Sequence, residues 1–401
     1  MRASRVLQKC LADSFRSMHL NRLRVLMRAV EALLSGRRLT LMDVARSWPG
    51  AERVRAPLKA FDRLLSNPRL HAERTQVYAG MAHWLLRSEQ PVIVVDWSDL
   101  KPDKSWGLLR AAVPVGGRSL PILDMVFPAG QLGTPKAEKA FLLQLKKIVP
   151  EGVTPILVTD AGYRAPWFRA VDAMGWHWLG RLRHRTLVKP VDARSQDDWV
   201  PSRALYALLE GYGTRDMGCM DTVRDRPWPC RVVIHRKCGK GRKHRNLNGE
   251  PARTTSSRKI AARYREPWLL VASPNLKLSA RQLVKLYARR MQIEQSFRDL
   301  KSHHYGSAFE DSLTRRGTRL DILLLVHALA NFASWLAGLA CEATGMDGWL
   351  SPTRTRRKLY STMRIGREAL IRLWPIGRIG EWLDRLRTLP PDVLAQTQAS
   401  A

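Results

Sequence analysis

Apolar residues recur at helical spacing through the first part of the chain. In LNRLRVLMRAVEALLSG (20–36) they return every three to four residues, and Gly36 is a candidate helix end. Two shorter helices are predicted on either side of Pro49–Gly50. Residues 1–88 are therefore expected to be helical. Short, basic, turn-separated helices suit a DNA-binding domain, and a plain helical bundle remains the alternative.

The pattern changes to strands at residue 91. PVIVVD (91–96) and TPILVTD (154–160) are continuous apolar runs, typical of strands buried on both faces. Between them, a hairpin turning at Gly116–Gly117 and a helix over 136–149 are predicted. A helix and a strand follow over 165–183. This order predicts an α/β fold, with three antiparallel strands first and parallel crossovers afterwards.

Helical periodicity disappears over about 184–265, where turn residues and charges dominate. We interpret this part as an insertion containing short strands such as CRVVIHRK. A strand over 266–273 and one long helix over 279–301, with Ser279 as N-cap, are then expected. The region 305–389 is predicted to be helical, and the last dozen residues to be frayed.

One apolar segment, 322–340, is close to the length that spans a bilayer. It contains His327, Asn331 and Ser334, and three arginines and an aspartate precede it. We interpret it as a buried core helix in preference to a membrane span.

The charge of the chain indicates its partner. Among 401 residues there are 68 lysines and arginines against 35 aspartates and glutamates, a formal net charge of +33. This excess costs self-repulsion in the compact state, so a polyanion such as DNA is the expected partner. An anionic membrane surface or plain solubility would account for the same charge less well.

Two of the predicted buried strands end in a carboxylate, Asp96 and Asp160. If these strands are neighbours, both carboxylates face one crevice, and a divalent cation would offset their repulsion. Oxygen ligands of this kind suit Mg²⁺ or Mn²⁺. The alternative is that each aspartate caps the next turn or helix. Asp99 and Asp103 are substitutes close to Asp96.

The helix predicted over 279–301 carries a polar stripe beside its apolar face. On a helical wheel that stripe is roughly 60° wide, and it contains Tyr287, Arg290, Glu294 and Lys301. A helix that needed only solubility would place its glutamate opposite the apolar side. The position of the stripe favours one wall of an active site. An intrahelical ion network at the edge of the core is the alternative.

These residues and their neighbours resemble the motifs of a known protein family. The spacing Y-(2)-R-(3)-E-(6)-K resembles the signature of bacterial insertion-sequence transposases, as do VDWSD around Asp96, TDAGYRAPW after Asp160 and EPWLL before the signature. The resemblance implies a ribonuclease H-like α/β core with a β-rich insertion. It implies a helical DNA-binding domain (1–88), a catalytic core (89–304, insertion about 184–265) and a helical C-terminal region (305–401).

The resemblance also implies the site and its partners. Asp96, Asp160 and Glu294 match the catalytic triad, which holds two Mg²⁺ or Mn²⁺ ions. Tyr287, Arg290 and Lys301 match residues that bind phosphates of the transposon end, and Trp268 matches a base-stacking tryptophan; a Trp packed in the core is the alternative. The implied protein is a cytoplasmic homodimer that binds inverted-repeat ends and target DNA, with no membrane partner.

A basic stretch lies inside the predicted insertion. RKCGKGRKHR (236–245) lacks the spacing of a phosphate-binding P-loop. We interpret it as a loop that follows DNA phosphates, with a solvated loop as the alternative. Its basic residues are Arg236, Lys237, Lys240, Arg242, Lys243 and Arg245.

Overall fold

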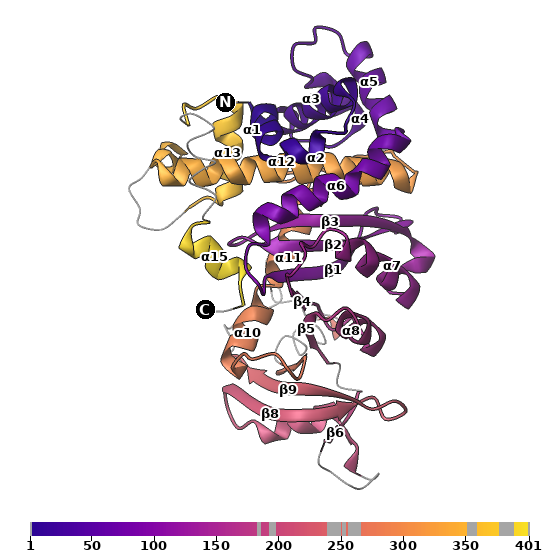
Figure 1. Cartoon of the computed structure of the whole chain (residues 1–401), viewed down its shortest axis with the longest axis vertical. Helices are drawn as coiled ribbons and strands as arrows, with labels where there is room; N and C mark the ends of the chain where they lie inside the picture. Colours follow the sequence, from indigo (N-terminus) through magenta and orange to yellow (C-terminus); the bar gives the residue numbers. More distant parts are fainter. Residues whose placement is uncertain are drawn as a thin grey trace. The chain divides into compact units, whose positions relative to one another are not determined.

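The computed structural model describes residues 2–182, 186–191, 198–238, 250, 254–255, 266–350, 359–376 and 389–399. Contacts divide the chain into two compact units (Figure 1). The first contains Met1–Pro155 and Arg289–Ala399, and the second contains Ile156–Ala288. The second unit is thus inserted between two segments of the first.

The first unit begins with the predicted helices, which confirms the helical interpretation of residues 1–88. They are α1 (Ala3–Cys10), α2 (Ala12–Phe15), α3 (Leu20–Gly36), α4 (Leu41–Arg46), α5 (Arg55–Leu65) and α6 (Pro68–Leu85). Side-chain caps begin several of them, such as Thr40 at α4 and Asn67 at α6. The cap after α3 is Arg37 at φ 68°, so the helix ends at Gly36 as expected.

Three antiparallel strands form the sheet of this unit. They are β1 (Val92–Asp99), β2 (Trp106–Pro114) and β3 (Ser119–Pro128), in the order β3-β2-β1. Gly116 and Gly117 have φ of 92° and 76°, which confirms the hairpin turn. A short 3-10 turn η1 (Ala129–Gln131) leads into α7 (Pro135–Lys146), the predicted helix.

The second segment of this unit completes its core. It contains α11 (Met291–Lys301), η4 (Phe309–Asp311), α12 (Gly317–Ala343), η5 (Met346–Leu350), α13 (Thr362–Ile371) and α15 (Pro391–Thr397). Helix α12 packs against α3, α6, α13 and β3 (Figure 1). It is the one helix in the described ranges that is long and apolar enough to cross a membrane, and 94% of its most apolar window is buried. It is a core helix, as predicted.

Polar contacts join α12 to the rest of this core. Asp321 on α12 is 3.0 Å from His71 and 2.9 Å from Arg74, both on α6. The same carboxylate accepts a hydrogen bond from the amide of Val126 on β3 (3.2 Å). One buried aspartate therefore fixes the N-terminal helices, the sheet and α12 in register.

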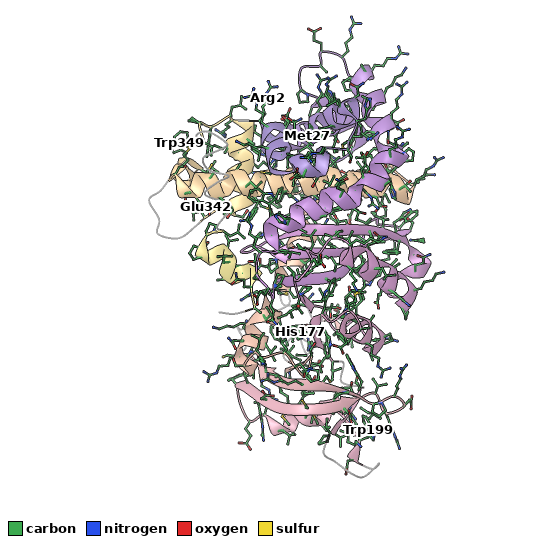
Figure 2. The ribbon with its side chains drawn as sticks, viewed as in Figure 1. Arg2, Met27, His177, Trp199, Glu342 and Trp349 are labelled. Atoms are coloured by element: carbon green, nitrogen blue, oxygen red, sulfur yellow. The ribbon has the colours of Figure 1, made fainter. Side chains whose placement is uncertain are left out.

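The second unit has its own α/β layer. Its strands are β4 (Ile156–Val158), β5 (His177–Arg181), β6 (Leu187–Pro190), β7 (Val200–Pro201), β8 (Gly213–Thr222), β9 (Trp228–Arg236) and β10 (Trp268–Ala272), with helices α8 (Ala165–Asp172), η3 (Ser202–Leu208) and α10 (Ala280–Ala288). Strand order is β4-β5-β10-β9-β8-β6-β7. The pair β4–β5 is parallel, as the crossover prediction required, and the other pairs are antiparallel. Figure 2 marks β5 by His177.

Three predictions about element boundaries were wrong. Strand β1 continues to Asp99, whereas β4 ends at Val158, two residues before Asp160. The expected single helix over 279–301 is two helices, since α10 ends at Ala288 and α11 begins at Met291. Ser279 does cap α10, because its hydroxyl accepts the amide of Gln282 (3.3 Å).

The C-terminal segment was also predicted wrongly. Instead of fraying, it forms α15 and returns to the sheet, where Gln398 pairs with Pro91 in an isolated bridge. The guanidinium of Arg289 donates to the carbonyls of Gln396 (3.0 Å) and Gln398 (2.5 Å). This contact lies at the break between α10 and α11.

Candidate active site

Asp96 lies where β1 emerges from the core. The strand's first four residues are buried and the last four are partly exposed, and Asp96 is the first of the exposed half. Its Oδ1 accepts a hydrogen bond from the amide of Trp97 (2.9 Å). The apolar run before it therefore fixes the backbone, while the carboxylate at its end remains within reach of solvent.

Helix α11 brings a second carboxylate to Asp96. Arg290 donates from Nη1 to Asp96 Oδ2 (3.2 Å) and from Nη2 to Glu294 Oε1 (2.5 Å). The side chains of Asp96 and Arg290 are each 14% exposed, and that of Glu294 is 40% exposed. One cation thus bridges two carboxylates from segments almost two hundred residues apart in sequence.

Packing and hydrogen bonds hold α11 in this position. Ile293, Phe297 and Leu300 are buried, as the apolar face of the predicted helix required. Ser296 accepts the amide of Ser119 on β3 (2.9 Å) and donates to its carbonyl (2.9 Å). Because this clamp fixes both the rotation and the height of the helix, Glu294 is held beside Arg290, where it remains partly exposed.

The predicted stripe of four polar residues on one helix does not exist as such. Tyr287 belongs to α10 in the second unit, while Arg290, Glu294 and Lys301 belong to the first unit. A helical wheel drawn through the break at Arg289–Arg290 is therefore invalid for Tyr287. Lys301 lies at the last residue of α11, partly exposed.

Asp160 is described within the second unit. It lies in the loop between β4 and α8, and its Oδ1 accepts the amide of Gly162 (2.7 Å). A Cβ added to Gly162 would lie 2.8 Å from that oxygen, so a larger residue there would displace the Asp160 carboxylate. This local turn orients the carboxylate, which remains partly exposed.

Trp268 and Tyr287 contact each other in the second unit. Their rings meet edge to face with centroids 5.1 Å apart, and the ring of His235 lies 5.7 Å from Trp268. Tyr287 is buried, whereas Trp268 keeps part of its surface exposed. Trp268 thus packs at the edge of an aromatic cluster and keeps part of its surface accessible.

The basic stretch is described only at its beginning. Arg236 is the last residue of β9 and Lys237 is exposed just after it. Lys240, Arg242, Lys243 and Arg245 lie outside the described residues.

Sequence reasoning missed a second ion pair on the same strands. Arg110 lies opposite Asp96 on the neighbouring strand and opposite Asp124 on the next. It binds Asp124 through two hydrogen bonds of 2.7 and 2.8 Å, and both side chains are fully buried. Its guanidinium also lies 5.3 Å from the ring centroid of Phe297 on α11. The signal was visible as single charges inside the apolar runs GLLRAAV and PILDMVF.

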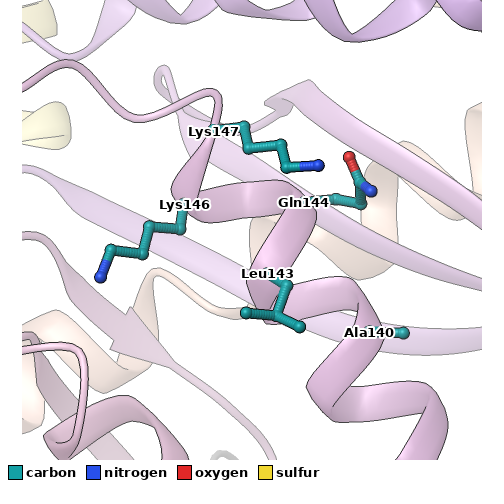
Figure 3. A pocket seen from close by; sticks show the side chains of 5 residues that line it. All are labelled: Ala140, Leu143, Gln144, Lys146 and Lys147. Atoms are coloured by element: carbon teal, nitrogen blue, oxygen red, sulfur yellow. The ribbon is translucent and has the colours of Figure 1, made fainter.

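A depression over α7 is a poor candidate for catalysis. It has a volume of about 460 Å³ and is lined by Ala140, Leu143, Gln144, Lys146 and Lys147 (Figure 3). Figure 3 shows the two lysine side chains extending away from each other. Without an acidic or nucleophilic side chain in its lining, this depression offers no chemistry comparable with that of the Asp96–Glu294 pair.

The carboxylates fit a divalent cation by their chemistry. In the described parts of the chain, no three His, Cys, Asp or Glu side chains gather as a complete metal site. Asp96 and Glu294 nevertheless share a single positive charge, that of Arg290. Carboxylate oxygens held together by a cation are the donor set that Mg²⁺ and Mn²⁺ take.

The charge, the fold and the pair of carboxylates together indicate a class of protein. A strongly basic α/β protein with paired carboxylates beside a central strand has the chemistry of a phosphoryl-transfer enzyme acting on nucleic acid. The sequence profile of the transposase DDE domain matches residues 87–331, and the chain belongs to this family. A search of curated proteins found no match. The mixed α/β architecture is consistent with the ribonuclease H-like fold of DDE transposases.

Proposed function

We propose that the protein is a cut-and-paste DNA transposase that binds the terminal inverted repeats of an insertion sequence. The observation that carries the proposal is the Asp96–Arg290–Glu294 cluster within a matched DDE domain. The signature and its contexts most resemble the transposase of a tetracycline-resistance composite transposon.

We assign Asp96, Glu294 and Asp160 as the catalytic triad. Two Mg²⁺ or Mn²⁺ ions, when bound, would stabilise the attacking and leaving oxygens of an in-line displacement at phosphorus. The three carboxylates would hold these ions. Arg290 is then released from at least one carboxylate and becomes available to a phosphate, which a guanidinium binds through two parallel hydrogen bonds.

The same site serves successive phosphoryl transfers. Water attacks a phosphodiester at the transposon end, the P–O bond breaks, and a 3′ hydroxyl leaves. That hydroxyl attacks the opposite strand and forms a hairpin, which water reopens. The 3′ hydroxyl finally attacks target DNA. Each step exchanges one P–O bond for another, so no oxidant or other co-reactant is needed.

Other residues have roles in binding. We assign Lys301 and Tyr287, with Arg290, to phosphates of the transposon end, and Trp268 to stacking on a base. The basic loop from Arg236 to Arg245 would follow the DNA backbone. We retain the three functional regions 1–88, 89–304 and 305–401, with the β-rich insertion over about 184–265, and a homodimer that pairs two ends in the bacterial cytoplasm at the nucleoid.

Cleavage of an end-containing duplex with Mg²⁺ tests the triad. Asp160→Ala is expected to abolish cutting. Asp103→Ala is the matched control, because this exposed carboxylate bonds only locally, to the amide and hydroxyl of Ser105. Cutting by Asp160→Ala at the wild-type rate would make the assignment wrong.

Two alternatives share the fold. A transposase-derived DNA-binding protein would retard DNA but yield no cleavage product with Mg²⁺ or Mn²⁺. A structure-specific nuclease would cut without strand transfer, so precut ends incubated with target DNA separate it from a transposase. The intact triad favours transposition over the first alternative.

A further inference from the structure

A cavity of about 500 Å³ lies within the second unit, on the face of its sheet that carries α8. Val271 of β10 lines it, together with Cys230 and Trp228 of β9. Successive residues of a strand point to opposite faces, so Trp268 lies on the other face of β10 from Val271. The cavity is therefore separate from the Trp268–Tyr287 contact.

One wall of the cavity is a stack of aromatic rings. Trp228 stacks on Trp178 (centroids 4.7 Å apart, planes at 29°) and on Phe168 (6.0 Å, 19°). The indole N–H of Trp178 donates to Asp172 (2.7 Å), and that of Trp228 bonds the same carboxylate. Two tryptophans held by one acceptor have fixed ring orientations before any ligand arrives.

The rim of the cavity is cationic. Arg164 is among its lining residues, and no acidic side chain is, within the described part of the chain. Arg181 also borders the cavity, but it pairs with Leu270 and its guanidinium donates to the carbonyl of Pro267 (3.5 Å), on the other face of the sheet. Arg169 lies 5.9 Å from the ring centroid of Trp228 and donates to the carbonyl of Arg226 (2.5 Å). Aromatic wall and guanidinium rim together suit a flat, π-rich ligand that carries a negative charge.

A strained residue closes the edge of the cavity. Val223, in the turn between β8 and β9, has φ of 65° and lines the cavity. A β-branched residue in this region of backbone space is an outlier, and such outliers concentrate at ligand clamps. The same turn contains Arg224 and Arg226.

We propose that this cavity binds one unpaired base of DNA, stacked beside Trp228, with the adjoining phosphate on Arg164. Base–aromatic stacking tolerates any base, because every base has a π-face, and the arginine supplies charge complementarity. The proposal rests on DNA being the partner of this family. It adds a second base-binding position to the one assigned to Trp268.

Binding of a fluorescent oligothymidylate strand, measured by polarisation without Mg²⁺, tests the cavity. Trp228→Leu is expected to weaken binding about tenfold or more, and Arg164→Gln severalfold with a shallower salt dependence. Trp199→Leu and Arg203→Gln are matched controls in the same unit, outside the lining, and are expected to bind as wild type does. Wild-type affinity in Trp228→Leu would overturn the proposal.

Photo-crosslinking keeps the test decisive if Trp228→Leu fails to fold. An oligonucleotide with 5-iododeoxyuridine is irradiated with the wild-type protein, and the adducts are mapped by mass spectrometry. An adduct on Trp228 or Tyr163 supports the proposal; adducts confined to Trp268 overturn it. In duplex form, 2-aminopurine placed at the transposon end or in target DNA identifies which one supplies the base.

The outcome is separable from the proposed transposition. Asp96→Asn, which should not cut, is expected to bind the oligonucleotide as tightly as wild type. Loss of cutting with retained binding therefore concerns the triad alone. A binding failure in the cavity leaves transposition untouched.

Discussion

Two ion clusters lie on the same row of strands in the first unit and use the same chemistry in opposite ways. Arg110 and Asp124 form a closed pair with two hydrogen bonds and no exposure. Arg290 instead divides its guanidinium between Asp96 and Glu294, with 14–40% of these side chains exposed. The two arrangements lie on adjacent strands, because Asp96 on β1 is the direct cross-strand neighbour of Arg110 on β2.

The difference between the two arrangements indicates which carboxylates a ligand can reach. In the closed pair the opposite charge is fully matched, so neither a metal nor a phosphate can enter without breaking a buried contact. In the open cluster one guanidinium contacts two carboxylates, and all three side chains are partly exposed to solvent. Burial, more than residue type, distinguishes the structural carboxylate from the ones that we propose to be catalytic.

The largest effect is expected from a substitution that disrupts the open cluster. Asp96→Asn is expected to lower the single-turnover rate of DNA cleavage on the order of a thousandfold or more, about 4 kcal/mol of transition-state stabilisation. The melting temperature should hold, because this side chain is partly exposed. Asp99→Asn, at the end of the same strand, is the control. If Asp99→Asn lost cleavage while Asp96→Asn kept it, the catalytic carboxylate would have been misassigned.

Breaking the Arg110–Asp124 pair should destabilise the fold without directly changing the proposed active site. Arg110→Met leaves the Asp124 carboxylate buried without its partner, so the free energy of unfolding in urea should fall by about 3–5 kcal/mol. The double variant Arg110→Met/Asp124→Leu should recover most of that loss, because no buried charge remains. Equal stability of the single and double variants would contradict the closed-pair interpretation.

A buried histidine, His327, should make the free energy of unfolding depend on pH. Burial, with a smaller contribution from Arg110, lowers the pKa of His327 from 6.5 to about 3. The unfolded chain therefore takes up a proton below pH 6.5 that the folded chain does not, and the free energy of unfolding should fall by about 1.4 kcal/mol per pH unit between these values.

The comparison with His327→Gln isolates this contribution from that of the carboxylates. Denaturation curves at several values between pH 4 and pH 7 (about the window of the shift) should diverge as the pH falls. Parallel curves for the two proteins would mean that His327 binds its proton over the same pH range in the folded and the unfolded chain.

The smallest expected effect sharpens the role of Arg290. Arg290→Gln removes the bridging cation, so the protein without DNA should bind Mn²⁺ about fivefold more tightly, roughly 1 kcal/mol. Cleavage should nevertheless be slower, because a phosphate ligand is lost. Arg290→Lys keeps the charge and should change Mn²⁺ affinity little. Isothermal titration measures both, and weaker Mn²⁺ binding by Arg290→Gln would show that Arg290 helps to form the metal site.

The local patterns predicted most of the elements that position the site. The apolar run into Asp96, the Gly116–Gly117 hairpin and the buried face of α11 are all properties of neighbouring residues, so periodicity and turn chemistry suffice. The sequence also predicted that Asp96 and Glu294 converge, and the structure brings both carboxylates to Arg290.

The break between α10 and α11 was not predictable in this way. The residues Tyr287 to Met291 include no glycine or proline, so propensity favours one continuous helix. A distant contact coincides with the break, because Arg289 binds carbonyls of Gln396 and Gln398. The same contact orders a C-terminal segment that by itself has weak helical signals. The Arg110–Asp124 partnership was hidden for the same reason: single charges were visible, but their pairing depends on strand register.

The position of α12 in the chain has a consequence for synthesis. It lies across the N-terminal helices and β3, yet the ribosome makes it only after the whole inserted unit. At 5–20 residues per second, the apolar faces of α3, α6 and β3 wait roughly 10–60 s for their cover. During that interval the nascent chain exposes a surface that chaperones bind, so the yield of folded protein should depend on translation speed and on chaperone supply more than its final stability suggests.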